Sequence, residues 1–193
     1  MMIHFKIRMY LPACLVLGAG FLLPSLGLST VVRWMTDQEM VDTANVVVRG
    51  YVNNVITEKR DGMIFRRVYL EVLWGYKADE KLGSTFELSV LGGNFREETL
   101  NIPGSSEFRI GEEVIVFAEA AGEHFVELGI GSGKYRVERR GDSALVFREL
   151  GPVQFAILKG GRAQFIPRPD VDTVKELHAF ELLLEKMVRG GTR

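Results

Sequence analysis

Residues 45–75 read NVVVRGYVNNVITEKRDGMIFRRVYLEVLWG and hold the pattern that decides the fold. Apolar side chains recur in this stretch with a period of two, which is the period of a β-strand that buries one face. Asp61-Gly62 separates the two alternating runs and favours a two-residue hairpin turn. The stretch therefore predicts a long antiparallel hairpin, whose second strand buries Val68, Leu70, Val72 and Trp74.

The same alternation continues after this hairpin. Further strands are expected at 86–90, 113–118 and 124–130, and further hairpins around Gly141-Asp142 and Gly160-Gly161. Many short strands separated by turns at spacings of about 8–12 residues are typical of a barrel or a sandwich. We therefore predict a mainly β protein, with an OB-like barrel or small β-sandwich over residues 45–167.

Two helices are expected at the ends of this β-region. Thr36 and Glu39 have the spacing of a capping box, which predicts a short helix over 36–44. A second helix is expected over 172–189, with Asp172 or Thr173 as its N-cap and Gly190-Gly191 as its stop. This C-terminal helix is expected to cover an opening or a sheet edge, so that residues 30–193 form a single β-rich domain.

The N-terminal segment predicts export. Lys6 and Arg8 precede an apolar run from Leu11 to Leu23, and small residues around Ser29 follow it. This order is that of a secretory signal peptide, so we expect residues 1–29 to be removed and the protein to be secreted or periplasmic. The alternative is an uncleaved helix that anchors an extracytoplasmic domain in the membrane, because residues 11–32 have about the length that spans a bilayer.

Composition narrows the possible functions. The first 29 residues hold two of the 24 Lys and Arg and none of the 25 Asp and Glu, so the remainder has a net charge of −3 (22 positive against 25 negative). Such a chain has no basic excess for nucleic acid. The one cysteine, Cys14, lies in the apolar run, which leaves no disulfide or thiolate metal site after cleavage. We expect no metal and no cofactor.

No motif predicts catalysis. His124 and His178 lack the spacing of metal ligands, and Gly129–Lys134 lacks the leading glycine and the following Ser or Thr of a phosphate-binding loop. Glu97-Glu98 and Glu112-Glu113 are adjacent pairs, whose side chains point to opposite faces of a strand. We therefore expect no catalytic residues.

The candidate site is the polar face of the first hairpin. Four residues that can bury area and still donate hydrogen bonds are expected there, namely Arg49, Tyr51, Arg67 and Tyr69. If the hairpin pairs as expected, these side chains share one surface that binds a partner. The alternative is a cross-strand ladder that only stabilises the sheet.

Several segments between residues 36 and 140 resemble a group of uncharacterised exported bacterial proteins. The resemblance lies in Ala44–Val52, Val72–Gly75, Leu91–Gly93, Phe108–Phe117 and Gly133–Val137. It implies an OB-type barrel similar to the domain of tissue inhibitors of metalloproteinases. Asn45 departs from the aspartate usual in the group, and the expected mature start near Thr30 has no cysteine with which to reach zinc. Inhibition by that mechanism is therefore not implied.

These observations lead to one main hypothesis about function. The chain is expected to be an exported, non-catalytic binding module whose partner is a protein, a peptide or a glycan. It is not expected to bind nucleic acid, and it would contact the membrane only through an uncleaved N-terminal segment. The alternatives are an exported hydrolase and a structural envelope protein held by an N-terminal anchor.

Overall fold

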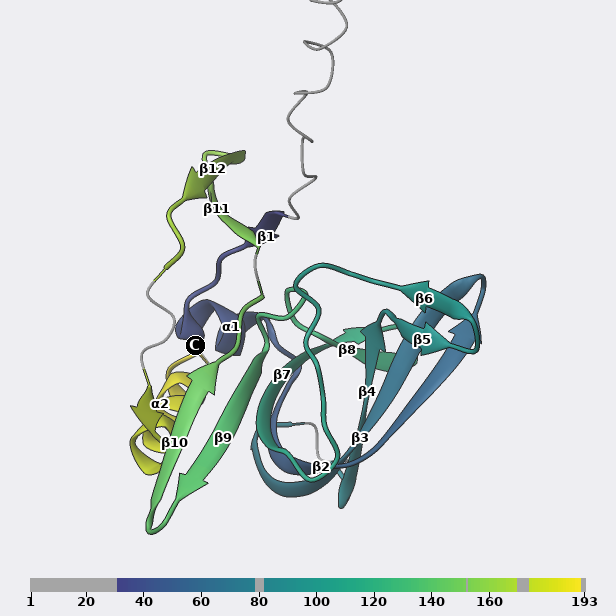
Figure 1. The fold of residues 1–193 in the computed structure, drawn as a ribbon. Coiled ribbons are helices and arrows are strands. Elements are labelled where there is room, and N and C mark those ends of the chain that lie inside the picture. The colour runs from purple at the N-terminus through teal and green to yellow at the C-terminus, as the bar shows by residue number, and fades with distance from the viewer. Residues whose placement is uncertain (1–30, 79–81, 152, 170–173, 192–193) are drawn as a thin grey trace, which may run out of the picture.

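The structure, a computed structural model, describes residues 31–78, 82–151, 153–169 and 174–191. The expected signal peptide lies outside these residues, as do Asp172 and Thr173. The described chain is mainly β, with one short helix near its start, α1 (Asp37–Thr43), and one at its end, α2 (Leu177–Gly190) (Figure 1). Neither helix in this part of the chain is long and apolar enough to cross a bilayer.

The main sheet has eight strands in the order β13-β10-β9-β7-β2-β3-β4-β8. Its members are β2 (Val46–Arg60), β3 (Met63–Lys77), β4 (Thr85–Leu91), β7 (Glu113–Ala121), β8 (His124–Glu127), β9 (Lys134–Arg140), β10 (Ser143–Arg148) and β13 (Lys175–Glu176). Because β7 also pairs with β8, the strands β2, β3, β4, β8 and β7 close into a ring. The predicted barrel is therefore present, and it has five strands.

The ring has the strand order of an OB-like barrel. Its first three strands follow one another along the chain, and β8 lies between β4 and β7, parallel to β4. A row of paired residues that starts at Ile56 passes through Arg67, Ser89, Val126 and Glu119, and returns to β2 beside Val46. This stagger of roughly ten residues is the shear that closing a small barrel requires. It accounts for the length of β2 and β3.

The first hairpin turns where the sequence predicts. Asp61 and Gly62 both have positive φ, at 51° and 80°, which is the type I′ geometry that matches the twist of two paired strands. Farther along, Gly50 lies very close to β3. A Cβ at this position would be 2.5 Å from the carbonyl oxygen of Glu71, so only glycine permits the approach.

The barrel interior is the first of two cores. Alternating residues of β2, β3, β4 and β7 fill it, as the period-two pattern predicts, and Phe125 of β8 packs against them: Val46, Val48, Val52, Val68, Leu70, Phe86, Leu88, Val90, Val114, Val116 and Ala118. Trp74, which the same pattern places inside, is instead 55% exposed. Gly50 pairs with Val72 and Arg49 with Trp74, so Leu73 is an extra residue in β3. This bulge shifts the alternation and turns Trp74 away from the core.

The second core lies between the outer face of the sheet and the two helices. Strand β7 supplies both cores, because Ile115 and Phe117 point outward between the inward Val114, Val116 and Ala118. Helix α2 packs Leu177, Phe180 and Leu184 against this outer face, and α1 adds Met40 and Val41. The C-terminal helix therefore covers a sheet face, with β9 and β10 extending that face beyond the barrel (Figure 1).

The predicted helix boundaries are confirmed at the first helix and shifted at the second. Thr36 caps α1, and both halves of the capping box with Glu39 are present. Helix α2 begins later than the pattern predicts, at Leu177, because residues 175–176 pair with β10 as the edge strand β13. The side chain of Glu176 accepts a hydrogen bond from the backbone N–H of Ala179 and so caps this helix.

Two smaller sheets complete the described chain. Strand β1 (Val31–Arg33) pairs in parallel with β11 (Gln154–Lys159), which forms a hairpin with β12 (Arg162–Ile166). The sequence pattern assigns residues 154–166 to the barrel, but this hairpin belongs to the separate sheet with β1. The third sheet is a short hairpin of β5 (Gly93–Phe95) and β6 (Glu98–Leu100).

Candidate binding cleft

The four predicted site residues fall into two groups with different neighbours. Arg49 belongs to an ion-pair network at the edge of α2. Its Nε lies 3.0 Å from Glu113, and its Nη1 contacts Glu181 on the helix. Arg139 donates two hydrogen bonds to Glu113, at 2.8 and 3.0 Å, and also interacts with Tyr51. Arg49 and Tyr51 therefore tie the barrel to α2 and β9.

Arg67 and Tyr69 lie on the outer face of β3 beside β4. The Arg67 guanidinium lies 5.6 Å from the centre of the Tyr69 ring. It also contacts Glu58 at 3.5 Å and Glu87 at 3.6 Å, and it is about one-third exposed. The hairpin pairs Arg67 with Ile56 and Tyr69 with Asn54, several residues along β2 from Arg49. Arg67 and Tyr69 therefore have different neighbours from Arg49 and Tyr51.

Arg67 lines a cleft of about 530 Å³ between β4 and β8. The cleft exists because these two strands are joined at a single pair, Ser89 and Val126. On the side of Thr85 they separate, although the rings of Phe86 and Phe125 still pack 5.2 Å apart. Among the described residues, the apolar lining includes Val46, Ala78, Leu82, Phe86 and Phe125.

Both signs of charge surround this apolar floor. Arg67 and Glu87 come from the strands, whereas Glu123 and His124 come from the β7–β8 hairpin. The Nε2 atom of His124 lies 2.7 Å from Nη1 of Arg60, so the tip of the first hairpin reaches the same region. Sequence patterns do not identify these residues as a site, because the cleft depends on where β4 and β8 diverge. The sequence signals are a histidine and two phenylalanines in separate strands.

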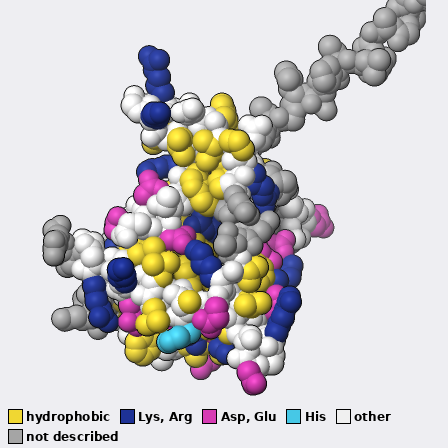
Figure 2. Space-filling model, turned by 90° about the vertical axis from the view of Figure 1, so that its left-hand side faces the viewer, with side chains coloured by type: hydrophobic (Ala, Val, Ile, Leu, Met, Phe, Trp, Pro, Cys, Tyr) yellow, Lys and Arg dark blue, Asp and Glu magenta, His cyan; other side chains and the backbone are white. Residues whose placement is uncertain are grey.

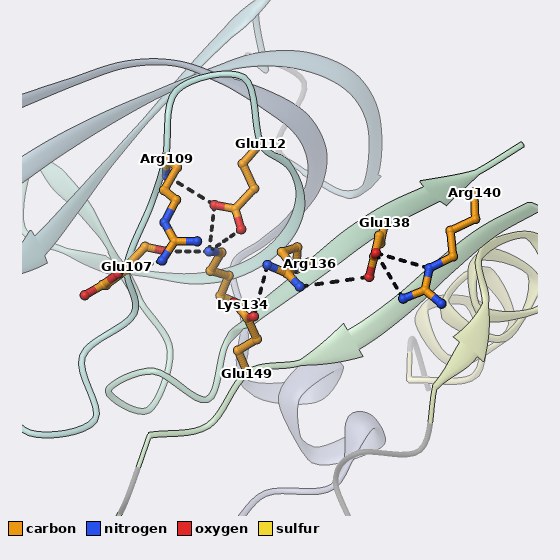
Figure 3. Close-up of polar contacts among 8 residues, drawn as sticks. All are labelled: Glu107, Arg109, Glu112, Lys134, Arg136, Glu138, Arg140 and Glu149. Carbon is orange, nitrogen blue, oxygen red and sulfur yellow. Dashed lines mark hydrogen bonds and ion pairs between the residues drawn. The ribbon is translucent and has the colours of Figure 1, made fainter.

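A second group of charged residues lies on the loop before β7 and along β9. Its basic and acidic side chains contact one another (Figure 3). Lys134 is buried, and its Nζ lies 2.8 and 2.9 Å from the carboxylate oxygens of Glu112. It also donates to the carbonyl of Glu107. Farther along β9, Arg136 contacts Glu149 at 3.2 Å and Glu138 at 4.0 Å. These contacts fix the loop to β9, so Lys134 is a structural residue.

Glu127 is a buried carboxyl group near this loop. Its Oε1 accepts a hydrogen bond of 2.7 Å from the hydroxyl of Ser106. Desolvation by burial raises its pKa from the ordinary value near 4.5 to about 7, against the opposing effects of Ser106, Lys134 and Arg66. The folded state therefore holds the proton more tightly than the unfolded chain does.

This pKa predicts a measurable pH dependence of stability. Because the pKa is raised on folding, the contribution of Glu127 is fully present below about pH 4.5 and is lost as the pH rises through 7. We expect Glu127→Gln to match the wild type near pH 4 and to be more stable by about 3 kcal/mol at pH 8. Urea unfolding at several pH values measures this difference. A difference that stays constant with pH would show that Glu127 does not titrate in this range.

The described residues contain no cluster of three or more His, Cys, Asp or Glu side chains that could hold a metal ion. Residues 129–134 form a turn leading into β9, with Lys134 engaged as above. Ser106 donates its hydroxyl proton to Glu127.

Comparison with known proteins adds no relative. No family model matches the sequence, and no curated protein or solved structure gives a match.

Proposed function

We propose that this protein is an exported, non-catalytic binding module that recognises a peptide segment of a partner protein in the cleft between β4 and β8. The N-terminal sequence supports the extracytoplasmic location, through the order of charge, apolar run and small residues in 1–29.

The observation that carries the proposal is the chemistry of the cleft. Its floor is apolar, with Phe86 and Phe125 in contact, and its volume of about 530 Å³ suits one or two large side chains. Its rim offers Arg67 to acidic groups, and Glu87 and Glu123 to basic ones. A peptide with one apolar anchor between charged residues is complementary to this arrangement.

The place of the cleft in the barrel supports the same function. OB barrels bind their ligands across strands two and three of the barrel and the adjoining loops. Here those strands are β3 and β4, and the loop between barrel strands four and five is the β7–β8 turn. Arg67 and Glu123 come from these elements. Arg67 is held by the Tyr69 ring and by two carboxylates, so ordering it costs little entropy when a partner binds.

The proposal predicts that Arg67 and Tyr69 matter for binding more than for folding. Peptides selected from a random display library against residues 30–193 are expected to carry an apolar residue flanked by charges. We expect Arg67→Ala with Tyr69→Ala to weaken their binding by about tenfold or more, as for a central interface pair. Isothermal titration calorimetry gives the affinities, and circular dichroism with urea unfolding checks that the variant still folds.

An exposed ion pair elsewhere provides a matched control. Arg109 and Glu107 contact each other at 3.2 Å and are both largely exposed. Replacing both with alanine is expected to leave peptide affinity unchanged. Equal affinity of the wild type and the Arg67/Tyr69 variant, or failure of the wild type to select any peptide, would contradict the proposal.

A further inference from the structure

The three-stranded sheet of β1, β11 and β12 has one buried and one exposed face. On the buried face, Val32 and Phe155 pair in register and are almost completely covered. Trp34 packs edge-on against Phe155 with 5.8 Å between ring centres. This face therefore fixes the sheet to the rest of the domain.

The opposite face exposes large apolar side chains. Gln154, Ala156 and Leu158 alternate along β11 and so share one face. Val31 of β1 pairs with Gln154, and Phe165 of β12 pairs with Ala156. Side chains two residues apart on a strand share a face, so Val31, Leu158 and Phe165 lie on the same side. They are 46%, 59% and 63% exposed. Figure 2 shows hydrophobic side chains gathered over this sheet at the upper end of the molecule.

The charges of this sheet all have one sign. Residues 31–36 and 153–169 contain Arg33, Lys159, Arg162 and Arg168 but no Asp or Glu, in a chain whose net charge is −1. Arg33 lies 3.9 Å from Glu39, and Arg168 donates to backbone carbonyls of residues 150 and 151. Within the described chain, Lys159 and Arg162 take part in no ion pair. They pair with each other at the tip of the hairpin and, by alternation, point to the side opposite Leu158 and Phe165. Arg33 pairs with Ala156 and therefore shares the exposed face.

The sheet also receives the N-terminal segment. Strand β1 begins at Val31, immediately after the thirty residues that contain the apolar run from Leu11 to Leu23. During export, or with an uncleaved anchor, that run lies in the membrane. Given the proposed export, on which this inference rests, the sheet is the part of the described domain nearest in sequence to the segment that enters the membrane.

We propose that the exposed face of the β1-β11-β12 sheet binds the surface of a membrane rich in anionic phospholipids. Leu158 and Phe165 would enter the boundary between headgroups and acyl chains. Arg33, on the same face, would contact phosphate groups, and the long side chains of Lys159 and Arg162 would reach them from the tip of the hairpin. Apolar side chains combined with basic ones are the pattern of segments that lie on such membranes. A surface without acidic groups complements an anionic bilayer, and this surface does not overlap the proposed peptide cleft.

Vesicle sedimentation tests the proposal. Both cores lie between Met35 and Leu184, so residues 30–193 contain what is needed to fold without the N-terminal segment. We expect this protein to bind vesicles of phosphatidylglycerol and phosphatidylcholine, to bind phosphatidylcholine alone much more weakly, and to dissociate at high salt. Replacing Leu158 and Phe165 with serine is expected to weaken binding by about tenfold or more, because the buried apolar area is lost.

Two further variants separate the contributions. Lys159→Glu with Arg162→Glu should also lose binding to anionic vesicles, since two attractive charges become repulsive. Ile110→Ser removes an equally exposed apolar group from the loop before β7 and should bind as the wild type does. The proposal fails if the wild type does not bind anionic vesicles or if the Leu158/Phe165 variant binds equally well. Analytical ultracentrifugation showing a dimer that this variant dissociates, without vesicle binding, would instead assign the face to a second copy of the chain.

Discussion

Replacing Lys134 with methionine is expected to lower the free energy of unfolding by about 3–5 kcal/mol. The Lys134 ammonium group is buried at the start of β9, where it contacts both carboxylate oxygens of Glu112 and the carbonyl of Glu107. It also lies 4.8 Å from the centre of the Phe108 ring. Methionine fills a similar volume but leaves the largely buried Glu112 carboxylate without its partner, and this unpaired charge causes most of the loss.

A double variant separates the unpaired charge from the loss of packing. Lys134→Met with Glu112→Leu removes both charges, so we expect it to recover most of the stability that the single change loses. Lys59→Met is the exposed control, because Lys59 pairs with a largely exposed Glu98, and it should cost less than about 1 kcal/mol. Urea unfolding measures all three. A cost below about 1 kcal/mol for Lys134→Met would mean that water reaches this pair.

Local features of the sequence predict much of the fold. The alternation in residues 45–75, the turn at Asp61-Gly62 and the capping box of Thr36 and Glu39 each involve neighbouring residues only. Such short-range interactions can be predicted from neighbouring residue types alone. The structure contains the alternating strands, the turn and the capping box. The same holds for the turn at Gly141, which has the positive φ expected of its first central position.

Features that depend on distant parts of the chain are not predictable in this way. Trp74 is exposed because an extra residue in β3 shifts the alternation, and the pattern of apolar residues does not reveal that bulge. The hairpin of β11 and β12 has the same alternation as a barrel strand, but its pairing with β1 places it in another sheet.

The candidate cleft has the same limitation. Arg67 and Tyr69 are recognisable as outward residues of a strand, and the structure gives them that position. Phe125 and Glu123 join Arg67 only because β8 passes beside β4 from about forty residues farther along the chain. The separation of these strands is a property of the closed barrel, so no local motif marks it.

Helix α2 provides the other large expected effect. Phe180→Ala should lower the free energy of unfolding by about 3–5 kcal/mol, because a buried aromatic side chain is lost and a cavity remains. Phe180 is almost completely buried, and its ring centre lies 4.9 Å from that of Tyr135 on β9. The ammonium group of Lys175 lies 4.6 Å from the same ring. The change therefore weakens the contact between the C-terminal helix and the outer face of the sheet.

Leu182→Ala is the matched control within the same helix. Leu182 is more than half exposed, so its replacement should change stability by less than about 0.5 kcal/mol. Both substitutions introduce alanine, which has a high helix propensity, so the main difference between the two variants is the packing that is lost. Urea unfolding followed by circular dichroism compares the two. Equal changes in the free energy of unfolding at both positions would mean that α2 does not pack through Phe180. A large change at Phe180 alone would show that the helix unfolds together with the rest of the domain.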